Sequence, residues 1–155
     1  MEQLLIFSAK YLFLAPVVLL GIYFLYQERS VKFNMVVFAV GSAVLAYGAA
    51  LIAKHLYMDP RPFVVGHFTP LVSHAADNGF PSDHTLLTSV LAAVGSYWNR
   101  KLGALLWVIA LVVGFSRVYA GVHHPIDIIG GVVIATLSTI FVALVLKNIL
   151  HRNIT

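Results

Sequence analysis

The chain has 155 residues, of which 60% are hydrophobic and 10% are charged. A soluble domain carries about 25% charged residues, so this composition nearly excludes a soluble globular protein, and it also excludes a disordered one. The absence of cysteine excludes disulfides, thiolate metal sites and cysteine-nucleophile phosphatases. In a chain this apolar, the net charge of +4 indicates basic loops at a membrane rather than a nucleic-acid partner. The length favours one domain, residues 1–155.

Apolar segments dominate the sequence, and a spanning helix needs about 20 mostly apolar residues. Five segments qualify or nearly qualify: residues 4–26, 35–53, 84–98, 102–116 and 128–146. The first is interrupted by Lys10, and the third and fourth are short. The predicted fold class is therefore all-α, a polytopic membrane helix bundle with five spanning helices.

The distribution of charge predicts how the bundle is oriented. Loops 27–34 and 99–101 and the tail 147–155 hold six basic residues against one acid, Glu28. Loops 54–83 and 117–127 carry mixed charge, and six of the seven histidines lie in or beside them. The positive-inside rule places the first set in the cytoplasm, so the N-terminus is expected outside, the C-terminus inside and the histidine-rich loops outside. The acidic start, Met1-Glu2-Gln3, is unlike a signal peptide, so the first segment is expected to remain as an anchor.

The first polar cluster is Lys54-His55-Leu56-Tyr57-Met58-Asp59-Pro60-Arg61-Pro62, at the outer end of the second segment. Arg61 stands between two prolines, which fix φ and stiffen the local chain. Lys54 and Arg61 together can clamp one oxyanion, the arginine as a planar fork and the lysine as a point charge. The alternative is a snorkelling lysine and a solvated arginine at a helix end.

The second cluster, Phe80-Pro81-Ser82-Asp83-His84-Thr85, precedes the third segment. Proline and serine here predict a helix start. A helix N-terminus offers free N–H groups and a positive dipole end to a phosphate. Ser82 can add a hydroxyl donor, and His84 lies in the first turn, facing whatever anion docks there. The alternative is plain helix capping, with Asp83 favourable near the dipole.

The third cluster runs from Ser116 to Asp127 and opens the fifth segment. Pro125 suits the first helical position, so Asp127 would lie in the first turn and reach back to a histidine, as a capping-box acid does. A carboxylate on one ring nitrogen fixes the tautomer and leaves the other nitrogen free for attack. The alternative is a capped helix start with an incidental aspartate.

Together the clusters supply a nucleophile with an orienting acid, a second histidine able to donate a proton, and cations for an oxyanion, all on one predicted face of the membrane. That is the inventory that phosphoryl transfer requires. We expect no metal ion, because a zincin helix motif is absent and Lys54, Arg61 and Arg117 would repel a divalent cation. We expect no other cofactor.

These residues resemble a known signature. Lys54-x6-Arg61-Pro62, Pro81-Ser82-Asp83-His84 and Ser116-Arg117-x5-His123-x3-Asp127 are similar, in order and spacing, to the three motifs of the type-2 phosphatidic acid phosphatase superfamily. The stretch His74-Ala75-Ala76-Asp77 followed by Phe80-Pro81-Ser82-Asp83-His84-Thr85 resembles, more narrowly, the bacitracin-resistance type of undecaprenyl-diphosphate phosphatase. The family usually has glycine at the position of Asp83, and many of its members have six spans.

The resemblance implies a metal-independent acid-phosphatase mechanism. His123 would be the nucleophile and form a phosphohistidine, Asp127 would orient it, and His84 would protonate the leaving group and then activate water. The implied substrate-binding residues are Lys54, Arg61, Ser82 and Arg117, with Asp83 grouped beside them. A carboxylate beside a phosphate is electrostatically unfavourable, so Asp83 is expected to point away or to serve a subfamily-specific role.

The short third and fourth segments put the motif residues near headgroup depth, where a lipid-borne phosphate can reach them. We therefore expect a polyprenyl or phospholipid substrate, and specifically hydrolysis of undecaprenyl diphosphate to undecaprenyl phosphate on the outer face of the cytoplasmic membrane, with loop 63–80 as a roof. The runner-up is a related phosphatase acting on phosphatidylglycerophosphate, diacylglycerol diphosphate or lipid A phosphate. A non-enzymic membrane subunit or anion carrier would instead bind without turnover. No nucleic-acid partner is expected, and the sequence predicts no oligomeric state.

Overall fold

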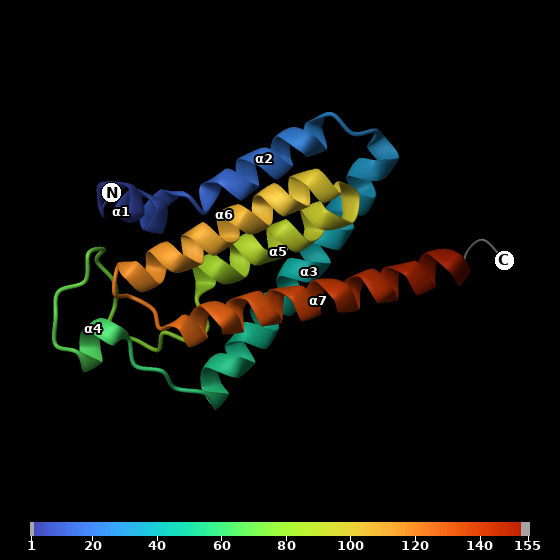
Figure 1. Ribbon diagram of the computed structural model, residues 1–155. Helices are drawn as coiled ribbons and strands as arrows, with labels where there is room; N and C mark the ends of the chain where they lie inside the picture. Colours follow the sequence, from blue (N-terminus) through green and yellow to red (C-terminus); the bar gives the residue numbers. More distant parts are fainter. Residues whose placement is uncertain (1, 153–155) are drawn as a thin grey trace.

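The computed structural model describes residues 2–152, and this part of the chain is helical throughout apart from its loops (Figure 1). The helices are α1 (Glu2–Tyr11), α2 (Leu14–Leu25), α3 (Arg29–Leu56), α4 (Pro62–Val65), α5 (Asp83–Trp98), α6 (Arg100–Tyr119) and α7 (Pro125–Arg152). Within residues 2–152 the β-type pairing is limited to an isolated bridge between Pro60 and Asn78. The predicted all-α class is confirmed. The last residues of the expected tail, 153–155, lie outside the described part.

Three helices, α3, α6 and α7, are long and apolar enough to cross a membrane, and the bent pair α1 and α2 can make a fourth crossing. Helix α5 has 16 residues, a length of roughly 24 Å at 1.5 Å per residue, which is shorter than a hydrocarbon core of about 30 Å. Large apolar side chains such as Val44, Ile52 and Leu137 are exposed on the outside of the bundle. This is the architecture of a multi-pass membrane protein with three to four candidate spans, and a fifth span stays a prediction.

The first expected span, residues 4–26, is divided in the structure. Helix α1 ends at Tyr11, α2 begins at Leu14, and the two helices meet at an angle of 56°. Pro16 explains the break, because proline has no N–H to donate to the carbonyl of Leu12 four residues earlier and its ring clashes with that carbonyl. The chain closes instead with a tighter bond from the Ala15 N–H to the Leu12 carbonyl, at 3.0 Å.

Helix α5 lies at the centre of the bundle, in contact with α2, α3, α6 and α7 (Figure 1). Its buried side chains Leu86, Val90 and Val94 join Phe38 of α3 and Leu106 of α6 in the main apolar core. The turn between α5 and α6 is one residue, Asn99, whose side-chain oxygen accepts the N–H groups of residues 101 and 102. This short connection makes α5 and α6 an antiparallel pair, so the start of α5 and the end of α6 lie at the same end of the bundle.

That end of the bundle also holds the end of α3, the start of α7, the loops around α4, and α1 (Figure 1). The three polar clusters of the sequence are therefore brought to one end. The basic residues Arg29, Lys32, Arg100 and Lys101 begin α3 and α6 at the opposite end. The separation of the two charge sets along the bundle agrees with the two sides expected from the sequence.

Candidate active site

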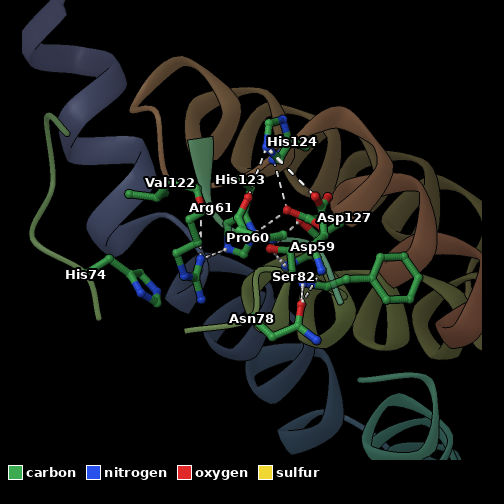
Figure 2. Close-up of polar contacts among 12 residues, drawn as sticks. Asp59, Pro60, Arg61, His74, Asn78, Ser82, Val122, His123, His124 and Asp127 are labelled. Atoms are coloured by element: carbon green, nitrogen blue, oxygen red, sulfur yellow. Dashed lines mark hydrogen bonds and ion pairs between the residues drawn. The ribbon is translucent and has the colours of Figure 1, made fainter. Parts of the chain in front are cut away.

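Two parts of the chain, Lys54–Arg61 and Asn78–Ser82, are held together by the side chain of Asn78. Its amide nitrogen donates to the carbonyls of Lys54 and Tyr57, both at 2.9 Å, and its oxygen accepts the N–H groups of Asp59 and Phe80, both at 3.0 Å (Figure 2). All four hydrogen-bonding positions of this amide are used. The end of α3 is thereby fixed beside the segment that leads into α5.

The start of α5 is an N-cap built by Ser82. Its hydroxyl oxygen accepts from the Thr85 N–H at 3.5 Å and from the Thr85 hydroxyl at 3.2 Å, and its own N–H donates to the Asp127 carbonyl at 3.1 Å. The side chain is fully buried. The structure thus shows helix capping at Ser82, while a contact with phosphate remains a prediction.

His123 and Asp127 meet at the start of α7. His123 Nδ1 lies 3.1 Å from Asp127 Oδ2, and the N–H of His124 donates to the same oxygen at 2.9 Å (Figure 2). Both side chains are buried, His123 at 3% exposed and Asp127 at 0%. This is the reach-back contact that the spacing of His123 and Asp127 predicts. Because a carboxylate accepts, the ring carries its proton on Nδ1 and keeps a lone pair on Nε2.

Arg61 lies on the other side of the His123 ring. Its Nη1 is 3.3 Å from His123 Nε2 and donates to the Val122 carbonyl at 2.8 Å (Figure 2). Its Nε donates to Asp77 at 2.8 Å. The guanidinium is 4% exposed, so these contacts hold a buried charge in one orientation. Burial alone would raise the pKa of Asp77, but the hydrogen bond and charge of Arg61 hold it below its usual range.

Asp59 lies beside Asp127, the carboxylate of the His123–Asp127 dyad. Burial, followed by the charge of Asp127, raises the pKa of the Asp59 carboxyl. Asp59 Oδ2 and Asp127 Oδ1 are both buried without a hydrogen-bond partner among the described residues. Two carboxylates in such surroundings repel each other, which is why the charge of Asp127 makes ionisation of Asp59 less favourable.

Burial is also the main influence on His123. It lowers the pKa of the His123 imidazole; the hydrogen bond to Asp127 opposes this, and the charges of Arg61 and Arg117 add to the lowering. The imidazole is therefore neutral near neutral pH, which is the form in which Nε2 can attack an electrophile.

Arg117, in the last turn of α6, has a different environment from Arg61. It is 3% exposed, and its Nη1 donates to the Ala9 carbonyl of α1 at 3.1 Å. Its Nε and Nη2 are buried without a hydrogen-bond partner among the described residues. Unpaired donors on a buried cation are costly, so this guanidinium is set up to take an anion.

A cavity of 510 Å³ adjoins Arg117. Its walls include His84 of α5, His74 of the preceding loop and Lys10 of α1. The His74 and His123 rings lie 6.0 Å apart between centroids, so the cavity begins beside the dyad. Basic and imidazole groups surround this space, and no carboxylate is among the described residues that line it.

The remaining predicted residues make no direct contact with His123 or Asp127 among the hydrogen bonds described above. Lys54 is 39% exposed, and its Nζ is 3.9 Å from Asp77 Oδ2, so it reaches the site through that carboxylate. Asp83 is exposed and lines a separate apolar groove between α3 and α5, with Ala46, Tyr47 and Leu87. His84 packs edge-on against Phe13, with ring centroids 4.7 Å apart. Phe80 of the expected roof packs on Tyr57 at 4.9 Å.

Sequence reasoning missed several groups that the structure brings to the site. Asp59 and Asp77 lie in the outer loops without a predicted role, Asn78 belongs to none of the predicted clusters, and Lys10 is predicted only as an outward-facing charge that interrupts an apolar segment. The stretch His74-Ala75-Ala76-Asp77 offers a signal for Asp77, because an acid in the same outer loop as Lys54 and Arg61 is expected to pair with one of them. No local pattern indicates the contacts of Asn78 or Lys10, which depend on how distant segments pack.

Comparison with known proteins identifies the family of this chain. The family model described as PAP2 superfamily matches residues 34–150. Undecaprenyl-diphosphatase BcrC of Bacillus subtilis (strain 168) is 34% identical over 138 residues, which cover 87% of this chain and 69% of that protein. Bacitracin transport permease protein BcrC of Bacillus licheniformis is 36% identical over 140 residues, 88% of this chain and 67% of that protein.

Two solved structures have a similar fold. Aquifex aeolicus LpxE superposes with a TM-score of 0.71 at 21% identity, covering 92% of this chain and 82% of that one. The PAP2 type phosphatidylglycerolphosphate phosphatase from Bacillus subtilis gives a TM-score of 0.54 at 23% identity, covering 96% and 87%.

Fold, site and relatives define a hydrolase of the membrane-embedded phosphatase class. The chain belongs to the PAP2 superfamily, and within it to the lipid phosphatases.

Proposed function

We propose that this protein hydrolyses undecaprenyl diphosphate to undecaprenyl phosphate and phosphate on the outer face of the cytoplasmic membrane. The observation that carries the proposal is the 34% identity to undecaprenyl-diphosphatase BcrC over 87% of the chain. The buried His123–Asp127 pair and the unpaired nitrogens of Arg117 beside a cavity supply a matching chemistry.

In the proposed reaction, His123 Nε2 attacks the terminal phosphorus while Asp127 holds the Nδ1 proton and stabilises the positive ring. A P–N bond forms, the bond from phosphorus to the bridging oxygen breaks, and His84 gives that oxygen a proton as undecaprenyl phosphate leaves. Arg61, Arg117 and Lys54, with backbone N–H groups at the start of α5, bind the phosphoryl oxygens. His84 then takes a proton from water, which attacks the phosphohistidine and releases phosphate.

The location rests on charge and on helix composition. Helices α3 and α6 begin at the end of the bundle away from the site (Figure 1), and their first residues include Arg29, Lys32, Arg100 and Lys101. The positive-inside rule puts such an end in the cytoplasm. The site then faces the periplasm or the cell exterior, with the N-terminus outside and the C-terminus inside. In this arrangement α5 is the fifth spanning element, its length made up by the loop that precedes it.

A second candidate is a related lipid phosphatase. Phosphatidylglycerophosphatase B of Bacillus subtilis is 33% identical over 99 residues, and lipid A 1-phosphatase of Rhizobium etli is 34% identical over 79 residues. These matches cover 57% and 50% of this chain, against 87% for BcrC, which favours the diphosphate substrate.

The test is phosphate release by the purified protein in detergent, with chelator present, from undecaprenyl diphosphate, phosphatidylglycerophosphate, diacylglycerol diphosphate and a lipid A phosphate. The expected result is the highest kcat/KM on undecaprenyl diphosphate and a loss of about 10³-fold or more in His123→Ala. His124→Ala is the matched control, because the neighbouring ring lies outside the pair and contacts Pro60 at 3.3 Å. Strict dependence on added metal, or near-normal turnover by His123→Ala, would contradict the mechanism, and binding without turnover would indicate a carrier.

A further inference from the structure

Lys10 is a cation in an apolar segment, and the motifs do not account for it. It lies in the last turn of α1 and lines the 510 Å³ cavity together with His84 and Arg117. A charged side chain within a membrane segment is costly unless it meets water or a partner of opposite charge. Its position beside a polar cavity meets that requirement.

The packing of α1 fixes Lys10 at this place. The preceding residue, Ala9, is fully buried in a small apolar cluster with Val72, Ala120 and Val122, and its carbonyl accepts a hydrogen bond from Arg117 Nη1 at 3.1 Å. The break after α1 then places Phe13 on the ring of His84. One bent segment therefore contacts both Arg117 and His84, and Lys10 lies between these two contacts in the chain.

The cavity lies beside the His123–Asp127 dyad and is lined by other residues of the site. Among the described residues, His84, Arg117 and Lys10 line it, whereas His123 does not. In phosphoryl transfer the attacking and leaving atoms lie roughly in line on opposite sides of the phosphorus. A leaving group that enters this cavity from a phosphoryl group held against His123 therefore meets His84, Arg117 and Lys10 on the cavity walls.

The leaving group of a diphosphate differs from that of a monophosphate ester in carrying charge. A second phosphate bears negative charge of its own, while an alcohol leaving group is neutral once protonated. Arg117 and Lys10 both line this cavity, and Nε and Nη2 of Arg117 are buried without a hydrogen-bond partner among the described residues. Two cations and no lining carboxylate make a region that favours a second phosphate over a neutral alcohol.

We propose that Lys10 binds the lipid-attached phosphate of a diphosphate substrate and so makes the site selective for lipid diphosphates over lipid monophosphates. This inference rests on the proposed function. It assigns α1, which lies outside the three motifs, a part in choosing the substrate.

The test compares Lys10→Met with the wild type on two substrates that share a prenyl chain, farnesyl diphosphate and farnesyl monophosphate. We expect Lys10→Met to lower kcat/KM about 10-fold or more on the diphosphate, mainly through KM, and less than about 2-fold on the monophosphate. Lys10→Arg keeps the charge and should stay within about 3-fold of the wild type on both. Lys101→Met is the matched control, because Lys101 is an exposed lysine at the opposite end of the bundle.

A second experiment tests the contact between Lys10 and the second phosphate without turnover. It measures binding of inorganic pyrophosphate and inorganic phosphate by calorimetry on the detergent-purified proteins. Lys10→Met should weaken pyrophosphate binding about 10-fold and leave phosphate binding unchanged. Equal losses on both anions, or unchanged selectivity in both assays, would overturn the role of Lys10. A wild-type protein that binds pyrophosphate through Lys10 but hydrolyses no lipid phosphate would overturn the proposed function alone.

Discussion

Two buried arginines lie on either side of the candidate site, and their surroundings differ. Arg61 is 4% exposed and its guanidinium is engaged by Asp77, the Val122 carbonyl and His123. Arg117 is 3% exposed, yet two of its nitrogens have no partner within the described residues. Two equally buried arginines thus have different roles. Arg61 holds the nucleophilic ring in place, while Arg117 keeps donors free for an anion.

The sharpest test of this comparison is to neutralise each arginine in turn. Arg117→Met should lower kcat/KM about 10²–10³-fold, the usual cost of removing a donor that stabilises transition-state charge. Its melting temperature should stay unchanged or rise, because the variant removes a buried cation that is largely unpaired. Turnover on the proposed lipid and thermal unfolding in detergent measure the two quantities.

Arg61→Met is the paired variant. It should also lower activity, but it should lower the melting temperature as well, because Asp77 and the buried Val122 carbonyl lose their donor. Equal changes in stability for the two variants would remove the distinction between the arginines.

A smaller effect is expected when the carboxylate of the dyad is neutralised. Asp127→Asn should lower kcat/KM about 10–100-fold through loss of a charge-assisted hydrogen bond. In the wild type, protonation of His123 blocks Nε2, so kcat/KM falls as the pH drops through the pKa of His123, which burial places below its ordinary value of 6.5. Asp127 raises that pKa, so the acid limb of Asp127→Asn should lie at still lower pH. The pH profiles of kcat/KM for the wild type and Asp127→Asn are recorded on the same substrate, so that ionisation of the substrate affects both equally. A shift of the acid limb of Asp127→Asn to higher pH would contradict the pairing of His123 with Asp127.

The smallest expected effect is at Asp59, on the carboxylate side of the dyad. Asp59→Ala should lower kcat/KM about 5-fold, since Asp127 Oδ1, buried without a partner among the described residues, loses the neighbouring carboxyl whose raised pKa favours a protonated, hydrogen-bond-donating form. Asp59→Asn should recover most of that loss, because its amide N–H₂ can donate to Asp127 at any pH. Steady-state rates of the two variants side by side are sufficient, and equal losses would indicate that Asp59 only fills space.

The sequence predicts the parts of this site that depend on short spacing. The three residues between His123 and Asp127 place the carboxylate one helical turn from the ring, and Ser82 begins α5 as an N-cap should. Most helix bounds lie within three residues of the apolar segments, but α3 begins six residues before residue 35 and α7 ends six residues after residue 146. The α1–α2 break at Pro16 follows from proline chemistry that the hydropathy pattern does not show.

The parts that could not be predicted depend on contacts between distant segments. Arg61 meets Asp77 from a loop 16 residues away and the Val122 carbonyl from 61 residues away. The packing of α1 gives Arg117 Nη1 a partner, the Ala9 carbonyl 108 residues away along the chain, while Nε and Nη2 have none among the described residues. Apolar patterns show that these helices pack together but not in which register, and the register decides which donors are left without partners.

The bridge between Pro60 and Asn78 has an evolutionary consequence. Because this bridge joins the two ends of the segment, residues 61–77 form a loop whose base is fixed by hydrogen bonds of the Asn78 side chain. Insertions or deletions near its tip can alter what covers the cavity without displacing α5 or α7, on which His84 and Asp127 are carried. The tip of the segment can therefore vary in length while its two ends, Arg61 and Asp77, stay paired beside His123.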